Sequence, residues 1–579
     1  MQKLAVRLSP QPVRPLLERM DPGGWGYDTA AFPGGEIGVV HPPSPRKTLL
    51  ERTGTGPGLL RLDNGDIIAW SGLPLAEGQR VKLTAARDLP RLAPQLDGVF
   101  AAVGWSVEDR KLYVITDFLG LQPVYVGDDG QGGWIAANET KVFPYTPDAA
   151  SWGAFIALGQ SIGRSTATRH AERLRPATVL IVTPEAGSNH PVETSRYWEM
   201  PGEGPEPPAR DVVEILKENA RAYHALAPEN VFLLSGGFDS RLLLAALHEL
   251  GAQNKKALIL SHYDEDADLD GKLAARVAQA TNTSIDYHHP DRNFFSTTAY
   301  LDYIKAIDGG TPNLYLFIAQ LASALQHRGA VWEGLIPALA LSTLQQVGDG
   351  TFDTYAREKF KNGTPAVQIF KPAARRIFLE AFHAEFERTK SLFPDTSHGM
   401  WQWIVENRMR NRAGVNPTKV YVNHVTPLMV GASRKLWEAA APISYQRRQN
   451  HAFYLDVFRE LSPQLTRIPF ISGSVLHRGE APWLTFRRYK AVQDAWRAVQ
   501  GRPRVARLLG LEKDMSFTPS RFVEHPALYA EEDDMLDMDV VRRAKTDILL
   551  RKQVGKMLFH WHTTRWVHEN RLHATLASA

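Results

Sequence analysis

The chain of 579 residues contains no cysteine. Disulfide bonds, zinc sites built on thiolates and cysteine nucleophiles are therefore excluded. Long apolar stretches are also missing, because no run of about 18 apolar residues occurs, and this predicts a protein without a membrane-spanning segment. Residues 1–14 (MQKLAVRLSPQPVR) contain no apolar segment of signal-peptide length, so we expect a cytoplasmic protein.

An excess of either charge is missing as well. The chain has 67 Lys and Arg against 63 Asp and Glu. This balance does not indicate a nucleic-acid partner. Hydrophobic residues make up 44% of the chain and charged residues 22%, which is typical of a globular protein. The length is sufficient for two to four domains.

A Walker A phosphate loop is missing too, since the two Gly-Lys pairs of the chain lack its other glycine and its Ser or Thr. A different glycine turn occurs at residues 231–240 (VFLLSGGFDS). Four apolar residues predict a buried strand, and the apolar periodicity of 241–250 predicts a helix. The glycines admit an anion close to the backbone, and a helix N-terminus favours negative charge. We interpret the segment as a loop for a pyrophosphate; an ordinary Gly turn is the alternative. The predicted nucleotide contacts are Ser235, Gly236, Gly237, Asp239 and Ser240, with Asp239 also holding Mg²⁺.

The order of elements predicts two different regions. Short alternating segments separated by Gly and Pro fill residues 1–199 and predict a β-rich domain with packed sheets. Residues 201–208 (PGEGPEPP) are predicted to form a linker. Helices and strands then alternate, which predicts a doubly wound parallel sheet whose ligands bind at the carboxyl ends of the strands. Residues 352–579 are predicted to be mostly helical. The predicted helices are 211–224, 240–250, 268–282 and 314–327, and the predicted strands are 231–234, 257–261 and 330–332.

Several segments, in this order, resemble the asparagine synthetase-like enzymes. LDGVFA at 96–101, TDFLGLQPVY at 116–125 and IAANETK at 135–141 are similar to the family patterns LDGxFA, RDxxGxxPLYY and fASExKAL. SGGFDS resembles the PP-loop of ATP pyrophosphatases. The resemblance implies a glutamine amidotransferase-like αββα sandwich (α+β) in residues 1–200, a linker at 201–209, and a PP-loop synthetase domain of the adenine nucleotide alpha hydrolase-like α/β class in 210–579. It also implies a nucleotide contact at Leu260, at the end of the next strand.

The chain departs from the family in two places. Glutaminase-active members carry a cysteine after the initiator methionine, whereas this chain has Gln2, so we expect the N-terminal domain to release no ammonia. The family also carries a GxGADE-like segment whose aspartate holds Mg²⁺. The equivalent here is EGLIPA at 333–338, with Leu335 near the expected aspartate. The candidate replacement carboxylates are Glu265, Asp266, Asp268, Asp270, Asp308 and Glu333.

Two residues are candidates for catalysis. Glu333 could act as a general base on an amine, or it could be a surface residue at a strand end. Amide-forming members use a lysine to stabilise charge in the transition state, and Lys490 is the nearest candidate. The alternative for Lys490 is a solvated basic helix face. The basic segment 542–573 could bind an acidic partner, but we favour a helix packed on the core. His560 and His562 within it make a poor zinc pair.

These features together predict an ATP-dependent amide ligase that adenylates a carboxylate and couples it to an amine. The missing cysteine makes the chain similar to lasso-peptide cyclases and β-lactam synthetases, so we expect intramolecular macrolactam or lactam formation on a small-molecule or peptide carboxylate. A biosynthetic partner protein is a further expectation. One alternative is amidation of a metabolite or glycan carboxylate with ammonia or another amine. Another is a non-catalytic paralogue that serves as a binding partner.

Overall fold

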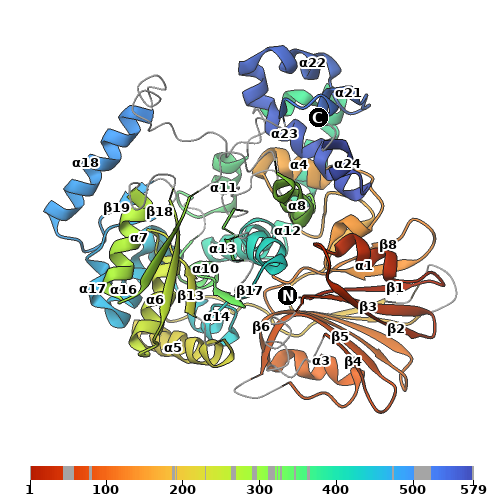
Figure 1. Cartoon of the computed structure of the whole chain (residues 1–579), viewed down its shortest axis with the longest axis horizontal. Helices are drawn as coiled ribbons and strands as arrows, with labels where there is room; N and C mark the ends of the chain where they lie inside the picture. Colours follow the sequence, from red (N-terminus) through yellow and green to blue (C-terminus); the bar gives the residue numbers. More distant parts are fainter. Residues whose placement is uncertain are drawn as a thin grey trace.

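The computed structural model describes most of the chain. Figure 1 shows two groups of sheets, with a helical C-terminal region packed beside both. Most of the helix predicted over 314–327 lies outside the described residues. The described residues are 2–43, 58–76, 81–184, 190, 192–227, 230–261, 269–289, 297–310, 320–321, 324–325, 329–343, 347–360, 365–472, 475–500 and 523–576.

Two antiparallel six-stranded sheets form the N-terminal region, in agreement with the predicted β-rich segment. Their strands come from alternating sequences, so each strand has one face toward the other sheet and one face away from it. The first sheet has the order β10 (Ala171–Arg173), β8 (Tyr125–Asp128), β9 (Trp134–Ala137), β1 (Lys3–Leu8), β3 (Gly35–His41), β2 (Gly26–Phe32). The second has the order β12 (Val192–Arg196), β11 (Thr178–Val182), β7 (Lys111–Thr116), β6 (Leu96–Ser106), β5 (Ile67–Ala76), β4 (Leu59–Arg61).

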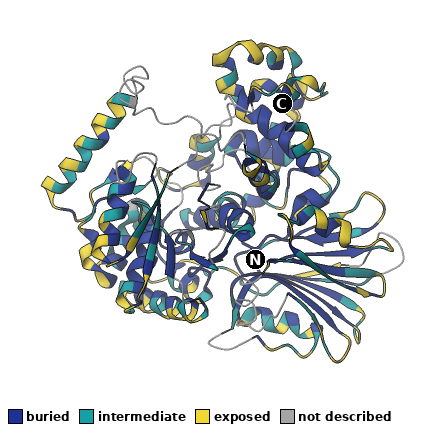
Figure 2. Cartoon of the chain, in the orientation of Figure 1, coloured by how far each residue is buried: buried dark blue, intermediate teal, exposed yellow. Residues whose placement is uncertain are grey.

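The two sheets pack face to face, and helices cover their outer faces. Leu4 and Val6 of β1 share a buried core with Val103 of β6, whereas Ala5 packs under helix α1 (Arg14–Met20). The outer face of the second sheet is covered by helical turns over residues 86–95, including α3 (Leu89–Leu92). Most strand residues of the two sheets are accordingly coloured as buried in Figure 2. The region is therefore layered helix, sheet, sheet, helix.

A five-stranded sheet with only parallel pairings follows. The chain starts in the middle at β13 (Asn230–Leu233) and proceeds outward to β14 (Lys255–Leu260) and β15 (Ser284–His288). It then crosses to the other side of β13 and forms β16 (Ala330–Trp332) and β17 (Thr426–Leu428). The order of the strands thus reverses between β13 and β16. The predicted strands 231–234, 257–261 and 330–332 are confirmed.

Helices connect and surround this sheet, and they dominate the chain after β16, as predicted. Those before and just after β16 are α5 (Ala209–Leu226), α6 (Asp239–Glu249), α7 (Leu269–Ala280), α8 (Thr298–Ile307) and α10 (Leu335–Leu341). The next are α11 (Phe352–Lys359), α12 (Pro372–Lys390), α13 (Ser397–Ile404), a π-helical segment (Val405–Ala413), α14 (Arg434–Ala440), α15 (Tyr445–Arg448), α16 (Ala452–Leu461) and α17 (Pro463–Thr466). A hairpin of β18 (Phe470–Ser472) and β19 (Val475–His477) precedes α18 (Trp483–Gln500), α21 (Ala527–Ala530), α22 (Met538–Thr546), α23 (Ile548–His568) and α24 (Leu572–Leu576).

Two buried arginines join the N-terminal sheets to the π-helical segment. The turn after β7 is held by Asp117, whose carboxylate accepts hydrogen bonds from the N–H groups of the next residues, including Gln122 at 2.8 Å. The carbonyl of Gly120 in this turn accepts hydrogen bonds from Arg173 (2.9 Å) and Arg410 (3.1 Å). A side chain at Gly120 would collide with Arg410, because a Cβ there would lie 2.9 Å from its Nε.

Helix α4 (Ala149–Leu158) leaves the N-terminal sheets and packs against helices of the C-terminal region. Its Trp152 and Phe155 lie in one buried cluster with Trp561 of α23 and Phe378 of α12. The basic C-terminal segment is thus largely packed on the core, as we favoured, although Leu549 remains 69% exposed. The predicted boundaries at 200 and 209 remain a prediction, since α4 lies before them and contributes to the later core.

None of the helices in the described part of the chain combines the length and the apolar character needed to cross a membrane.

Buried neutral histidines on α23 make stability depend on pH. Burial lowers the pKa of His560 to about 3 and that of His562 to about 4, below the ordinary value of 6.5. The unfolded chain therefore binds protons that the native chain excludes, and the free energy of unfolding falls as pH decreases from 6.5 to 4. We expect His562→Gln to reduce this slope by up to about 1.4 kcal/mol per pH unit. Thermal unfolding between pH 7 and 4 measures the slope. His573→Gln, at a half-exposed residue, is the control. Equal slopes for the wild type and both variants would contradict the role of His562.

Candidate functional site

The glycine loop lies at the point where the strand order reverses. It follows β13, and Glu333 follows the neighbouring strand β16, so both stand at the carboxyl ends of adjacent parallel strands. At such a point of an open parallel sheet, the connections from the two strands leave in opposite directions. Gly334 allows the two connections to touch: a Cβ there would lie 2.6 Å from the backbone of both Asp239 and Ser240. The sequence between β13 and α6 therefore folds into the predicted strand, turn and helix.

The N–H groups of the loop point at acceptors within the protein. The Ser235 N–H donates to Ser240 Oγ (3.2 Å), and the Gly237 N–H donates to Ser235 Oγ (3.3 Å). The Gly236 N–H donates to the carboxylate of Asp270 (3.1 Å), at the first turn of α7. A carboxylate thus accepts one of the bonds that a phosphate oxygen would accept. A Cβ at Gly236 would lie 3.0 Å from the Cβ of Leu273, so little space exists there for a side chain.

Arg241 fixes the loop to a distant turn. Its guanidinium is fully buried and donates to the carbonyls of Leu465 (3.1 Å), Ile468 (2.8 Å) and Pro469 (3.0 Å). It also donates to the carbonyl of Gly236 (3.2 Å) within the loop. Burial lowers the pKa of Arg241 to about 9, so it remains charged at neutral pH. The position of the loop therefore depends on the turn between α17 and β18.

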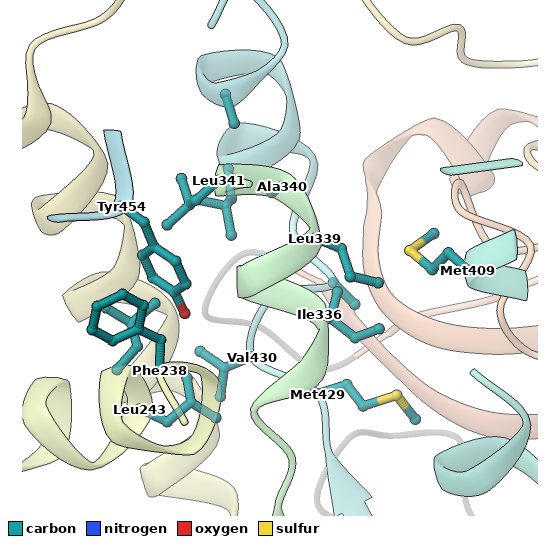
Figure 3. Close-up of a cluster of buried hydrophobic side chains, with 14 of the residues drawn as sticks. Phe238, Leu243, Ile336, Leu339, Ala340, Leu341, Met409, Met429, Val430 and Tyr454 are labelled. Carbon is teal, nitrogen blue, oxygen red and sulfur yellow. The ribbon is translucent and has the colours of Figure 1, made fainter. Parts of the chain in front are cut away.

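Aromatic side chains and a hairpin cover the loop. Phe238, the variable residue of SGGFDS, stacks on Phe470 of β18 with ring centroids 3.6 Å apart, and it contacts Tyr454 of α16. Figure 3 shows the rings of Phe238 and Tyr454 side by side, opposite α10. The Ile471 N–H donates to the carbonyl of Gly236 at 3.1 Å. His451, at the start of α16, completes this cover.

Asp239 and Glu333 form a pair of like charges beneath this cover. Burial first, and the negative charge of Glu333 second, raise the pKa of Asp239 from 3.8 to about 7. Asp239 is half-buried, and so is Glu333. A divalent cation would relieve this repulsion. Mg²⁺ is usually held by one or two carboxylates together with phosphate oxygens, so the donor set fits that ion. No cluster of three or more His, Asp or Glu side chains suited to a metal occurs within the described ranges.

The structure brings some of the predicted site residues together and separates others. Asp270 reaches the loop, as described. Asp308 does not, because it accepts hydrogen bonds from the backbone N–H groups of Thr140 and Lys141 and pairs with Lys419 at 2.9 Å. Leu260 is half-buried at the carboxyl end of β14. The candidates Glu265, Asp266 and Asp268 lie outside the described residues.

Lys490 lies on α18. Figure 1 shows that this helix projects away from the central body. Its ammonium forms an ion pair with Asp494, one turn later in the same helix. The neighbouring Tyr489 packs with Leu273 of α7, so α18 contacts the sheet region through its first turns. The role of Lys490 in catalysis remains a prediction.

Sequence reasoning missed the partners that shape the site. Nothing in the sequence marks Arg241, the residue that follows the loop, as buried. Tyr454 and His451 lie more than 200 residues after the loop in the chain. The only signal for them is indirect, since the apolar ring of Phe238 inside a polar loop requires a covering surface.

The comparisons with known proteins include two weak structural likenesses. No family model and no curated protein matches the chain. Glutamine phosphoribosylpyrophosphate (PRPP) amidotransferase from B. subtilis, complexed with ADP and GMP, is 13% identical over 49% of this chain and 65% of its own, with a TM-score of 0.21. The allosteric regulatory enzyme of purine biosynthesis is 11% identical over 50% of this chain and 82% of its own, also with a TM-score of 0.21. At these scores the likenesses carry no argument about fold or activity.

Neutralising Asp239 should stabilise the protein in the absence of ligand. The pKa of Asp239 is about 7 in the native state and near 3.8 when unfolded, so its charge costs stability as pH rises through this range. We expect Asp239→Asn to raise the free energy of unfolding at pH 8 by about 1 kcal/mol or more, and by less at pH 5. Thermal unfolding at pH 8 and at pH 5 measures this change in stability. Asp353→Asn, at a side chain 92% exposed, is the control; an unchanged or lower midpoint for Asp239→Asn at pH 8 would refute the like-charge pair.

Proposed function

We propose that the protein is an ATP-dependent amide ligase of the asparagine synthetase-like type, with a PP-loop nucleotide site at residues 235–240. One observation carries the proposal: the SGGFDS turn and the Asp239–Glu333 pair lie at the carboxyl ends of β13 and β16, where the strand order reverses. This is the place at which open parallel sheets bind their ligands. The glycine turn supplies a backbone for phosphates, and Asp239 supplies a ligand for Mg²⁺.

The reaction has two steps. An oxygen of the substrate carboxylate attacks the α-phosphorus of ATP, the bond from that phosphorus to the bridging oxygen breaks, and pyrophosphate leaves. An amine nitrogen then attacks the acyl carbon; the carbon–nitrogen bond forms, the bond to the AMP oxygen breaks, and the amine loses a proton. We propose that Glu333 accepts that proton. Mg²⁺, when bound, supplies positive charge to the leaving pyrophosphate. The backbone of Gly236 and Gly237 holds the phosphates, and the Phe238–Phe470 cover excludes water.

The amine comes from a source other than glutamine. The N-terminal sheets resemble a glutamine amidotransferase in their layers, but Gln2 is fully buried at the start of β1 and the chain has no thiol. We therefore propose that one bound molecule supplies both groups, as in lasso-peptide-type macrolactam or lactam formation, because ring closure benefits from proximity. Amidation of a metabolite or glycan carboxylate by ammonia or another amine is the alternative within this class.

A non-catalytic role as a binding partner is the second candidate. One observation favours it: the N–H groups of Ser235, Gly236 and Gly237 all donate to acceptors of the protein itself. A nucleotide would have to displace the carboxylate of Asp270. The two candidates differ in whether MgATP binds.

Binding of MgATP tests the proposal directly. A ligand that binds only the native state stabilises it by about 2.7 kcal/mol at a hundredfold excess over its Kd. We expect MgATP to raise the thermal midpoint of the wild type and to have little effect on Asp239→Ala, since the variant lacks the ligand for Mg²⁺. Asp353→Ala is the matched control and should respond like the wild type.

Pyrophosphate release then separates the ligase from the binding partner. Carboxylates that raise pyrophosphate release by the wild type, and not by Asp239→Ala, would identify the substrate class. If MgATP raises the thermal midpoint of none of these proteins, the proposed nucleotide site is contradicted. The binding-partner role then remains.

A further inference from the structure

A hollow lies between the N-terminal sheets and the helical region, and none of its lining residues belongs to the glycine loop. Its volume is about 440 Å³, within the range of small-molecule sites. The turn after β7, the end of β12 with the following linker, the turn between α12 and α13, and the π-helical segment form its walls. Neither the ligase chemistry nor the predicted nucleotide contacts involve these residues.

The walls of the hollow are fixed by hydrogen bonds. The side chains of His398 and Gln402 on α13 both donate to the carbonyl of Pro201 in the linker, at 3.2 and 3.1 Å. Trp198 packs edge-on against Phe118, with centroids 5.1 Å apart, and its indole N–H donates to Glu438 at 2.9 Å. The hollow is therefore built from positioned side chains and has aromatic surface on one side.

Two guanidinium groups, those of Arg175 and Arg196, and the largely buried carboxylate of Glu406 line this hollow. Arg175 binds Glu406 through two hydrogen bonds, of 2.8 and 3.1 Å. Arg196 has no comparable partner among its described contacts: it donates to the carbonyl of Pro176 at 3.3 Å, and its nearest carboxylate is the largely exposed Glu199 at 3.7 Å. Glu199 is 78% exposed, so the solvent screens that pair. One positive charge in the wall thus remains without a buried counter-charge.

We propose that this hollow binds a small organic carboxylate with an aromatic or other apolar body. The carboxylate pairs with Arg196, whose planar guanidinium matches two carboxylate oxygens. The apolar body lies against Trp198, which is half-buried in the wall. One uncompensated charge fits a monoanion, and the exposed Glu199 and Glu203 at the rim disfavour ligands with several negative charges. The site is independent of the nucleotide loop.

A pair of probes that differ only in charge tests the proposal. We expect 1-naphthaleneacetate to bind the wild type in isothermal titration calorimetry, and the neutral 1-naphthaleneacetamide to bind about tenfold more weakly, because it lacks the charge-assisted hydrogen bonds. Arg196→Gln should weaken binding of the acetate about tenfold and leave binding of the acetamide unchanged. Arg164→Gln, which removes an exposed charge paired with Glu172, should bind both probes like the wild type.

A variant that narrows the hollow gives a second criterion. Leu392 lines the hollow and is 46% exposed, so Leu392→Trp adds volume at its edge without changing the charge. We expect it to weaken binding of both probes, with circular dichroism and thermal unfolding like those of the wild type. The proposal is overturned if the wild type does not bind the acetate, if both probes bind equally well, or if Arg196→Gln and Leu392→Trp bind the acetate as the wild type does. MgATP should leave these affinities unchanged, whether or not the nucleotide site exists.

Discussion

The glycine loop depends on one buried guanidinium. Arg241 donates to three carbonyls of the turn at 465–469 and to the carbonyl of Gly236, and these groups are separated by more than 220 residues of chain. Burying a charge is costly unless its hydrogen bonds are satisfied, so Arg241 requires the carbonyls of the turn. Those carbonyls likewise require the N–H donors of Arg241. The hairpin that begins at Phe470 is thereby held over Phe238, and the cover of the site is part of the same unit as the loop.

Buried arginines that donate to main-chain carbonyls also occur at other places where irregular segments meet. Arg410 and Arg173 converge on the carbonyl of Gly120 at the junction of the two regions, and Arg448 donates to carbonyls that include those of Ile443 and Ala440. Arginine suits this task because its planar group presents five N–H donors in fixed directions. In a chain that has no cysteine, and so no disulfide, buried arginines on main-chain carbonyls join parts that sequence separates.

The sequence was informative where local periodicity decides the structure. Alternation predicted the N-terminal sheets, and the apolar strand, glycine turn and helix at 231–250 fold as predicted. The edge strand β17 was not predicted, because it has only three residues and contains Pro427, which an edge strand tolerates. The positions of the Asp270 and Asp308 side chains in the fold could not be predicted either. Both are acidic residues near a helix end, and only tertiary packing places one on the glycine loop and the other beside Lys419. The assignment of Lys490 rests on resemblance alone.

The contact between Asp270 and the Gly236 N–H has a consequence for selectivity. A carboxylate attached to the protein competes for this donor at a high effective concentration, in the millimolar range or above for short tethers. A small monovalent anion would accept the same hydrogen bond that Asp270 already accepts. It would also lose translational freedom on binding. A polyphosphate can engage several donors and a cation at once, and so can compensate for expelling the carboxylate. The side chain of Asp270 would then exclude small monovalent anions from the loop and allow polyphosphates to bind.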